Sequence, residues 1–163
     1  DPRHPLAGLK SGNYWPYRLA RAEARASGDD EALLLTTDGL VAEGSASNVF
    51  IFEGPRLLTP PLTCGILPGV TRSAVLSLAA RLGIPVAEEA FPPERLLDAH
   101  EAFLTNSLVG IVPLVAVDGR PVGEGRPGPR TAGLAAELAE LVKQPDSGRR
   151  PGRPGRGAAQ AAT

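Results

Sequence analysis

Two adjacent segments of the sequence each place two strand-like runs around a glycine-containing turn. In "EALLLTTDGLVAEG" the turn is Asp38-Gly39, and in "SNVFIFEGPRLLTP" it contains Gly54. A short turn with glycine between two apolar runs is typical of a β-hairpin. Two consecutive hairpins favour a sheet built mainly by hairpin connections over a series of parallel crossovers.

Helical patterns alternate with these hairpins. Residues 14–28 ("YWPYRLARAEARASG") predict an amphipathic helix with Pro16 in its first turn and Gly28 at its end. Residues 68–83 ("PGVTRSAVLSLAARLG") predict a second helix that Gly83 closes. Four apolar residues of this second helix are expected to share one face: Val70, Ala74, Leu78 and Leu82.

The remaining segments continue the alternation. Strands are predicted over 84–91, 101–108 and 111–122, and helices over 92–99 and 128–143. We therefore predict an α+β fold with a mixed, largely hairpin-built sheet and packed helices.

The last residues of the chain differ sharply in composition from the rest. Residues 145–163 are dominated by Pro, Gly, Arg and Ala and offer almost nothing to bury, so they predict a disordered tail. The predicted domain spans 1–144. The chain begins without Met, which indicates a piece of something longer.

Charge and cysteine content narrow the class of protein. Before Gln144 the chain carries 13 basic and 17 acidic residues, a balance that argues against a nucleic-acid partner. No apolar run is long enough to cross a bilayer, so no membrane association is expected. The single Cys64 cannot form an internal disulfide, which favours the reducing cytosol.

Three kinds of chemical group stand out along the chain. Lys10, one of two lysines, lies among apolar and small residues in "PLAGLKSGNYWPY", and Glu43 ends a predicted strand. The helix start at "LPGVTRSAV" offers unpaired backbone N–H groups to an anion. Taken singly, each has an ordinary explanation: a surface lysine with a partly buried stem, or a simple helix cap. Together they supply an amine nucleophile, a carboxylate and an anion cradle.

These groups match the needs of pyridoxal 5'-phosphate. Its aldehyde forms an imine with a lysine, its ring nitrogen stays protonated when a carboxylate faces it, and its phosphate needs several N–H and O–H donors. The sequence therefore indicates a pyridoxal phosphate site.

Five motifs carry a resemblance to one family. In order, they are "LKSGNY", "EGSASNVF", "LPGVTRSAV", "FLTNSLVGIVPL" and "VGEGRPGP". Their order and spacing resemble the class IV aminotransferases, the fold-type IV pyridoxal phosphate enzymes, over residues 6–143. The resemblance implies the large domain of D-amino acid aminotransferase-like enzymes, with the family's N-terminal small domain absent from this sequence.

The resemblance also assigns roles to individual residues. It implies that Lys10 is the catalytic, imine-forming lysine, that Glu43 pairs with the ring nitrogen, and that Tyr14 lies near the ring hydroxyl. It implies that three residues hold the phosphate: Val70, Thr71 and Ser107.

Other polar residues receive no chemical role. Asn48 and Arg72 also match recurrent family positions, and we interpret both as structural, because buried polar groups need partners. His4 and His100 fit no motif, and with one cysteine they indicate no metal site.

The family resemblance leaves three functions open. The segment "TNSLVGIVPL" is more similar to 4-amino-4-deoxychorismate lyase, which releases pyruvate and 4-aminobenzoate in folate synthesis, and we favour that activity. The "GNY" after Lys10 and "VGEGRPGP" favour a branched-chain or D-amino acid aminotransferase instead. A truncated, inactive chain serving as an interaction module is the third. The resemblance implies a small amino substrate and a homodimer in the full-length parent.

Overall fold

The computed structural model describes residues 1–12 and 14–143. The helices are α1 (Trp15–Ala26), the short 3-10 turn η1 (Leu62–Cys64), α2 (Val70–Arg81), α3 (Pro93–Leu97) and α4 (Pro129–Lys143). The strands are β1 (Leu33–Leu35), β2 (Val41–Gly44), β3 (Ser47–Glu53), β4 (Arg56–Thr59), β5 (Val86–Glu88), β6 (Glu101–Asn106), β7 (Gly110–Leu114), β8 (Ala116–Val117) and β9 (Arg120–Pro121).

Strands β1 to β7 form one sheet, in which β3 is central. The order runs β1-β2-β3-β4-β5, and β6 pairs with both β3 and β7. Its pairs are antiparallel except for β4–β5, which the crossover through α2 makes parallel. The prediction of a largely hairpin-built α+β fold is therefore confirmed.

One edge of β3 is divided between two neighbours. Its first residues, Ser47 and Asn48, pair with β2, whereas residues 51–53 pair with β4. Between them the carbonyl of Val49 accepts a hydrogen bond from the Thr59 hydroxyl at 2.7 Å. We call this divided edge the β3 fork.

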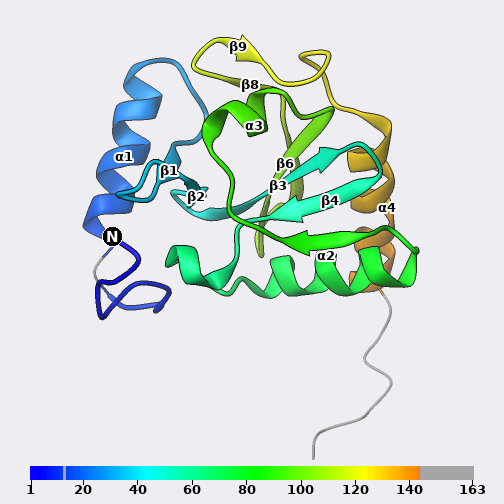
Figure 1. The fold of residues 1–163 in the computed structure, drawn as a ribbon, viewed down its shortest axis with the longest axis horizontal. Coiled ribbons are helices and arrows are strands. Elements are labelled where there is room, and N and C mark those ends of the chain that lie inside the picture. Colours follow the sequence, from blue (N-terminus) through cyan, green and yellow to red (C-terminus); the bar gives the residue numbers. More distant parts are fainter. Residues whose placement is uncertain (13, 144–163) are drawn as a thin grey trace, which may run out of the picture.

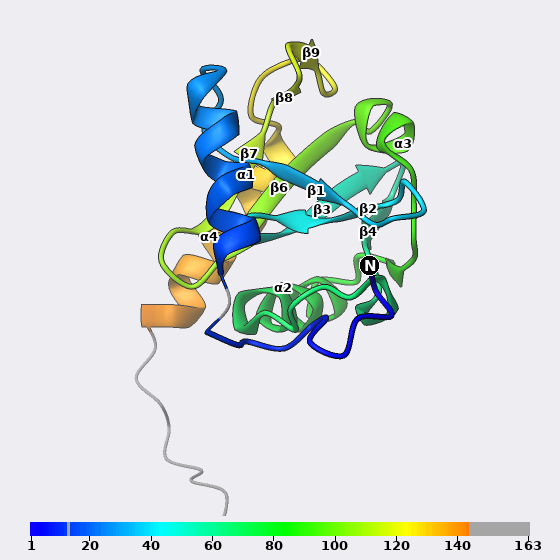
Figure 2. The ribbon, with the colours of Figure 1, turned by 90° about the vertical axis from the view of Figure 1, so that its left-hand side faces the viewer.

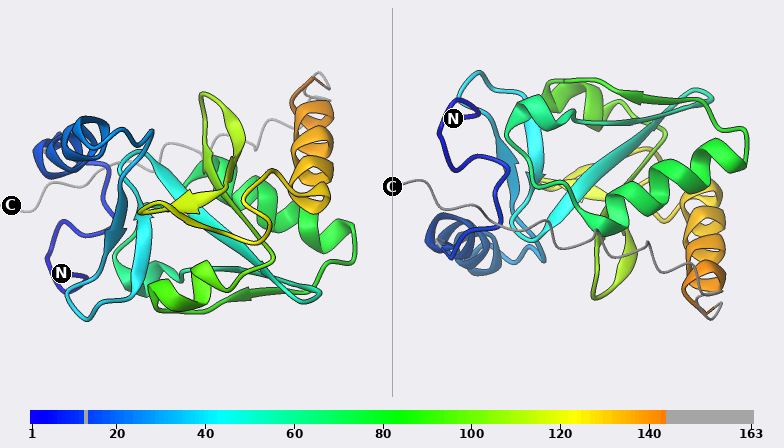
Figure 3. Two further views of the ribbon diagram at one scale, coloured as in Figure 1. Left: turned by 90° about the horizontal axis from the view of Figure 1, so that it is seen from above. Right: turned by 90° about the horizontal axis from the view of Figure 1, so that it is seen from below.

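Both faces of the sheet are covered. On one face α2 and α4 pack over Phe50, Phe52 and Phe103, and the rings of Phe50 and Phe103 stack with centroids 5.0 Å apart. On the other face Leu96 of α3 and Val122, just after β9, pack in a second core. Figure 1 shows α2 below the strands and α3 with β8–β9 above them, and Figure 3 shows α1 and α4 at opposite ends.

The buried face of α2 differs from the predicted one. Val75, Leu78 and Ala79 face the core, whereas Val70 is 78% exposed and Leu82 is 47% exposed. The four predicted residues lie four positions apart. Because an α-helix has 3.6 residues per turn, residues at this spacing move gradually around the helix and do not stay on one face. The actual face follows the i, i+3, i+4 pattern.

The predicted strand over 111–122 is also wrong in extent. The structure divides it into the end of β7 and the hairpin β8–β9. Asp118 and Gly119, at the turn of this hairpin, both have positive φ, 48° and 72°. An Asp-Gly pair is a hairpin signal, so the division was visible in the sequence.

Two further findings bear on the sequence analysis. The tail predicted over 145–163 lies outside the described residues. No helix among the described residues combines the length and apolar character needed to span a membrane.

Candidate active site

Glu43 lies buried at the end of β2 and is only 6% exposed. Its Oε2 accepts hydrogen bonds from the backbone N–H of Leu67 at 3.0 Å and from the Asn48 side chain at 3.4 Å. Its Oε1 accepts a long hydrogen bond, 3.4 Å, from the Tyr17 hydroxyl. The carboxylate is therefore held by three groups, two of which, Tyr17 and Leu67, are far from it in sequence.

Glu43 forms no ion pair within residues 1–12 and 14–143. Burial raises its pKa above the ordinary value, and the hydrogen bonds from Leu67 and Tyr17 counter that rise only in part. A buried carboxylate of this kind is the complement of a buried cation.

Asn48 joins Glu43 to the segment that leads into α2. It lies opposite Glu43 in the β2–β3 ladder and donates a hydrogen bond to the carbonyl of Leu67 at 2.9 Å. Its side-chain oxygen occupies the space where a Cβ on Gly69 would stand. Residue 69 must therefore be glycine for the chain to pass this close, which agrees with our interpretation of Asn48 as structural.

The start of α2 is open to an anion. Gly69 is the N-cap and no side chain caps the helix, and its first turn contains no acidic residue. Val70 is exposed and Thr71 is half-buried. The first N–H groups and the positive end of the helix dipole are thus available to a phosphate.

Ser107 lies at the same edge of the sheet. Asn48 pairs with Thr105 across β3–β6, and Ser107 follows two residues later, exposed, in the turn after β6. The Asn106 side chain accepts hydrogen bonds from the backbone N–H groups of Leu108 and Val109, at 2.9 and 3.0 Å, and so fixes that turn. The Thr105 hydroxyl beside Asn48 is buried without a hydrogen-bond partner within the described ranges.

Lys10 is exposed in the N-terminal segment and forms no hydrogen bond or ion pair among the described residues. A Cβ on Gly8 would stand 3.0 Å from the carbonyl oxygen of Ile66, so this segment packs against the chain that leads into α2 (Figure 2). Lys10 is two residues further on, which is about 7 Å of extended chain at most. Lys10 and Glu43 form no hydrogen bond or ion pair with each other.

Tyr14 immediately precedes α1 and is 42% exposed. It lines a pocket beside α1 together with Tyr17, which contacts Glu43. The structure thus brings Glu43, the start of α2 and the end of β6 to one edge of the sheet, with Tyr14 just before the neighbouring helix α1. The chemical roles of these residues remain predictions.

Sequence reasoning missed two groups that hold Glu43. Tyr17 follows Tyr14 by three residues and so shares its side of α1, a signal that the spacing already contained. The N–H of Leu67 belongs to the backbone, and no side-chain pattern could indicate it.

Comparison with known proteins identifies the family of this chain. The sequence pattern of the family described as "Amino-transferase class IV" matches residues 1–117, well over half of the chain. The chain belongs to the class IV aminotransferase family. Members of this family depend on pyridoxal phosphate.

Named class IV relatives are mainly branched-chain aminotransferases. The chain is 42% identical over 127 residues to the branched-chain-amino-acid aminotransferase of Escherichia coli K12, covering 78% of this chain and 41% of that protein. It is 39% identical over 132 residues to that of Pseudomonas aeruginosa, covering 81% of this chain and 43% of the relative. The chain thus spans less than half the length of the curated relatives it matches.

Solved class IV structures show the same fold. The E. coli branched-chain aminotransferase superposes with a TM-score of 0.81 at 39% identity, over 85% of this chain and 46% of that one. A Legionella pneumophila protein provisionally assigned as a 4-amino-4-deoxychorismate lyase gives 0.80 at 35% identity, over 86% and 52%. A branched-chain aminotransferase from T.th., solved with pyridoxamine 5'-phosphate, gives 0.78 at 37% identity, over 80% and 43%.

The residues present fit the cofactor of the class IV family. The buried Glu43 has no cationic partner among the described residues, as expected of a group that faces a protonated ring nitrogen. The open start of α2 and the turn at Ser107 offer donors for a phosphate.

Proposed function

We propose that this chain forms the cofactor-binding part of a pyridoxal phosphate-dependent branched-chain aminotransferase. The observation that carries the proposal is the buried Glu43, which Leu67 ties to the open start of α2. The relatives support the aminotransferase, which was our alternative, over the lyase that we favoured from "TNSLVGIVPL".

Pyridoxal phosphate, when bound, supplies an aldehyde that reacts with amines and a ring that accepts electrons from the substrate's α-carbon. Glu43 holds a proton at the ring nitrogen through its buried negative charge. The N–H groups of Val70 and Thr71 and the Ser107 hydroxyl bind the phosphate, and Tyr14 orients the ring hydroxyl.

Lys10 would supply the amine that holds the cofactor through its aldehyde, and the same Nζ would move protons beside the reacting carbon once a substrate amine has taken its place. Its exposure in the N-terminal segment keeps the amine accessible. The substrate is a small amino acid, and the full-length protein works as a homodimer. A cytosolic location remains a prediction from the single cysteine.

The decisive experiment traps the cofactor on its lysine. The purified full-length protein is loaded with pyridoxal phosphate, reduced with borohydride and digested, and the modified peptide is identified by mass spectrometry. We expect the adduct on Lys10. Lys143→Ala is the matched control, since Lys143 is the other lysine of the chain and is exposed at the end of α4.

Lys10→Ala should lose the adduct and the associated visible absorbance band, and Lys143→Ala should keep both. An adduct that persists in Lys10→Ala would contradict the role of Lys10 and assign the imine to another amine. No adduct in the original protein would contradict the proposal and favour an inactive chain that acts only as an interaction module.

The lyase is the second candidate, because the L. pneumophila structure matches nearly as well as the aminotransferases. Leucine should convert the bound cofactor to its amine form and yield a 2-oxo acid if the protein is a branched-chain aminotransferase. Release of pyruvate from aminodeoxychorismate, with no reaction on leucine, would instead support the lyase.

A further inference from the structure

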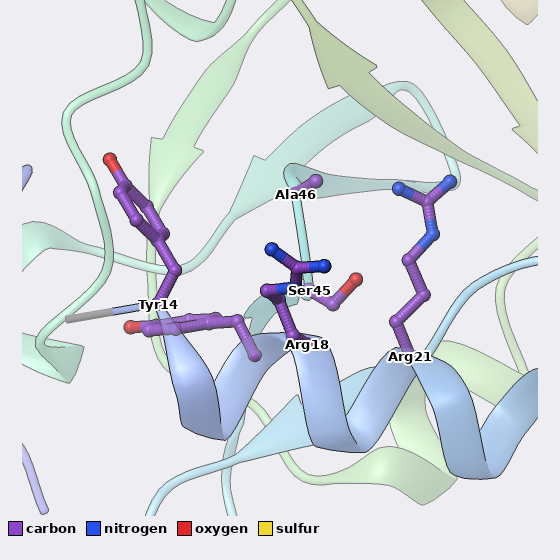
Figure 4. A pocket seen from close by; sticks show the side chains of 6 residues that line it. Tyr14, Arg18, Arg21, Ser45 and Ala46 are labelled. Carbon is purple, nitrogen blue, oxygen red and sulfur yellow. The ribbon is translucent and has the colours of Figure 1, made fainter. Parts of the chain in front are cut away.

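A pocket of about 270 Å³ lies between α1 and the β2–β3 turn. Its walls are Tyr14, Tyr17, Arg18 and Arg21 of the α1 region, and its floor is the turn residues Ser45 and Ala46. Figure 4 shows that the side chains of Arg18 and Arg21 both rise from α1 on the side where Ser45 and Ala46 lie.

The two arginines have no anionic partner among residues 1–12 and 14–143. Neither guanidinium forms an ion pair there. The Nε of Arg21 is buried and has no hydrogen-bond partner within the same ranges. Arg21 is half-buried and Arg18 is exposed, so the unpaired Nε–H of Arg21 is the one buried donor here, and leaving such a donor without an acceptor is costly.

Other contacts hold the pocket in shape. The guanidinium of Arg18 lies over the ring of Trp15, with Cζ 5.6 Å from the ring centroid. The carboxylate of Glu31 accepts hydrogen bonds from the backbone N–H and the hydroxyl of Ser45. Tyr17 donates its hydroxyl to Glu43. The two nearby acids, Glu31 and Glu43, therefore bind Ser45 and Tyr17 and do not pair with the arginines.

These neighbours select the kind of anion. Glu31 and Glu43 add negative potential near the pocket, which disfavours a ligand with two charges at one end, such as phosphate. A carboxylate carries one charge on two coplanar oxygens and matches the planar fork of a guanidinium. The tyrosine rings offer apolar surface for a short carbon chain.

We propose that Arg18 and Arg21 bind the carboxylate of a small organic acid. This site is separate from the phosphate cradle predicted at the start of α2, and it adjoins Glu43 through Tyr17. It shares Tyr14 with the predicted cofactor site and extends the binding surface from there along α1.

The test measures binding of valerate, a straight-chain monocarboxylate, to the full-length protein without cofactor. Binding is followed by saturation-transfer NMR and by the fluorescence of Trp15, the one tryptophan of these 163 residues. A Trp15→Phe variant identifies the part of the signal that comes from this ring. No turnover is required, so the readout does not need the loaded enzyme. Valerate binding that Arg18→Gln and Arg21→Gln both leave unchanged would belong to the substrate site of the proposed aminotransferase and would contradict this proposal.

We expect Arg21→Gln to weaken valerate binding about tenfold or more, which corresponds to the loss of one charge-assisted hydrogen bond. Arg18→Gln should have a similar effect. Arg21→Lys, which keeps the charge but loses the fork, should give an intermediate loss and guards against a folding defect. Arg25→Gln is the control, because Arg25 is exposed on the same helix and does not line the pocket.

Three other results would overturn the proposal. The first is no saturable valerate binding, which would indicate that a carboxylate of the protein itself occupies the arginines. The second is an equal loss in Arg25→Gln. The third is tighter binding of inorganic phosphate than of valerate through the same two arginines.

Discussion

The carboxylate of Glu43 accepts a hydrogen bond from the backbone N–H of Leu67 at 3.0 Å, although 24 residues separate them in sequence. This bond joins the end of β2 to the chain that enters α2. It places Glu43, the predicted partner of the ring nitrogen, next to the predicted phosphate cradle at the start of α2. A substitution at either of these two places is therefore expected to change the structure at the other.

Replacing Glu43 with Gln should remove activity while keeping the fold. The amide has nearly the same shape and can still accept the N–H of Leu67, but it carries no charge to hold a proton on the ring nitrogen. We expect kcat to fall about 100-fold or more, as when one charge-stabilising group is removed from an active site. Unchanged kcat in the loaded protein would disprove the assigned role of Glu43.

Replacing Gly69 with Ala should destabilise the protein, because the new methyl group would occupy the space of the Asn48 side-chain oxygen. Overpacking of this kind costs about 1–3 kcal/mol of the free energy of unfolding. The double variant with Asn48→Ala should be less destabilised than the sum of the two single variants.

Gly133→Ala is the matched control for this comparison. Gly133 lies inside α4 with no atom within 4 Å of an added Cβ, so alanine there should stabilise the protein by about 0.5–1 kcal/mol. Urea unfolding measures the stability of these four variants and of the original protein. Equal effects at positions 69 and 133 would show that Asn48 leaves room for a side chain.

Glu43 should also make stability depend on pH. Burial raises its pKa in the folded protein above the ordinary value of 4.5. Its buried negative charge therefore costs nothing below pH 4.5, and the cost develops as the pH rises through the folded pKa. The melting temperature of Glu43→Gln relative to the original protein, both without cofactor, should increase from about pH 4 to about pH 7. A constant difference over this range would show that Glu43 keeps an ordinary pKa.

Arg95 should give the opposite pH dependence. Its guanidinium pairs with Glu53 at 2.6 Å and Glu89 at 2.6 Å, and these hydrogen bonds lower the pKa of both carboxyls. The stabilisation is present above the ordinary pKa of 4.5 and is lost as the pH falls through the lowered values.

Arg95→Gln should accordingly lower the melting temperature at neutral pH, and the loss should shrink below about pH 4 and in high salt. Arg81→Gln is the comparison, since Arg81 is exposed at the end of α2 and has no ion pair in the described part of the chain. If Arg95→Gln lowers the melting temperature as much below pH 4 as at neutral pH, then Arg95 stabilises the protein by packing and not by its ion pairs.

Local signals in the sequence predicted the elements well. The hairpins at Asp38-Gly39 and Gly54 are confirmed because glycine at positive φ is a local requirement of those turns. The buried face of α2 was predicted wrongly, because a spacing of four residues drifts around the helix, whereas the residues that face the core follow the i, i+3, i+4 pattern.

The sequence predicted the side chains of the candidate site, but it could not predict the backbone contacts that hold them. Glu43 and the start of α2 came from motifs, and the structure places them together. The N–H of Leu67 and the tight passage of Gly69 past Asn48 depend on a loop that no residue pattern describes. The pocket beside Arg18 and Arg21 could not be predicted from the pattern of α1, because the turn that faces these arginines lies 24 residues or more further on.

The β3 fork leaves β2 attached to β3 by two residue pairs, whereas β3 and β6 share five. The β1–β2 hairpin is therefore expected to open locally more often than the centre of the sheet, and its amide protons to exchange sooner with solvent. Glu43 lies on this hairpin, so any molecule held by its carboxylate would also hold the hairpin closed. Loading of the cofactor and ordering of that corner of the protein would then be a single equilibrium.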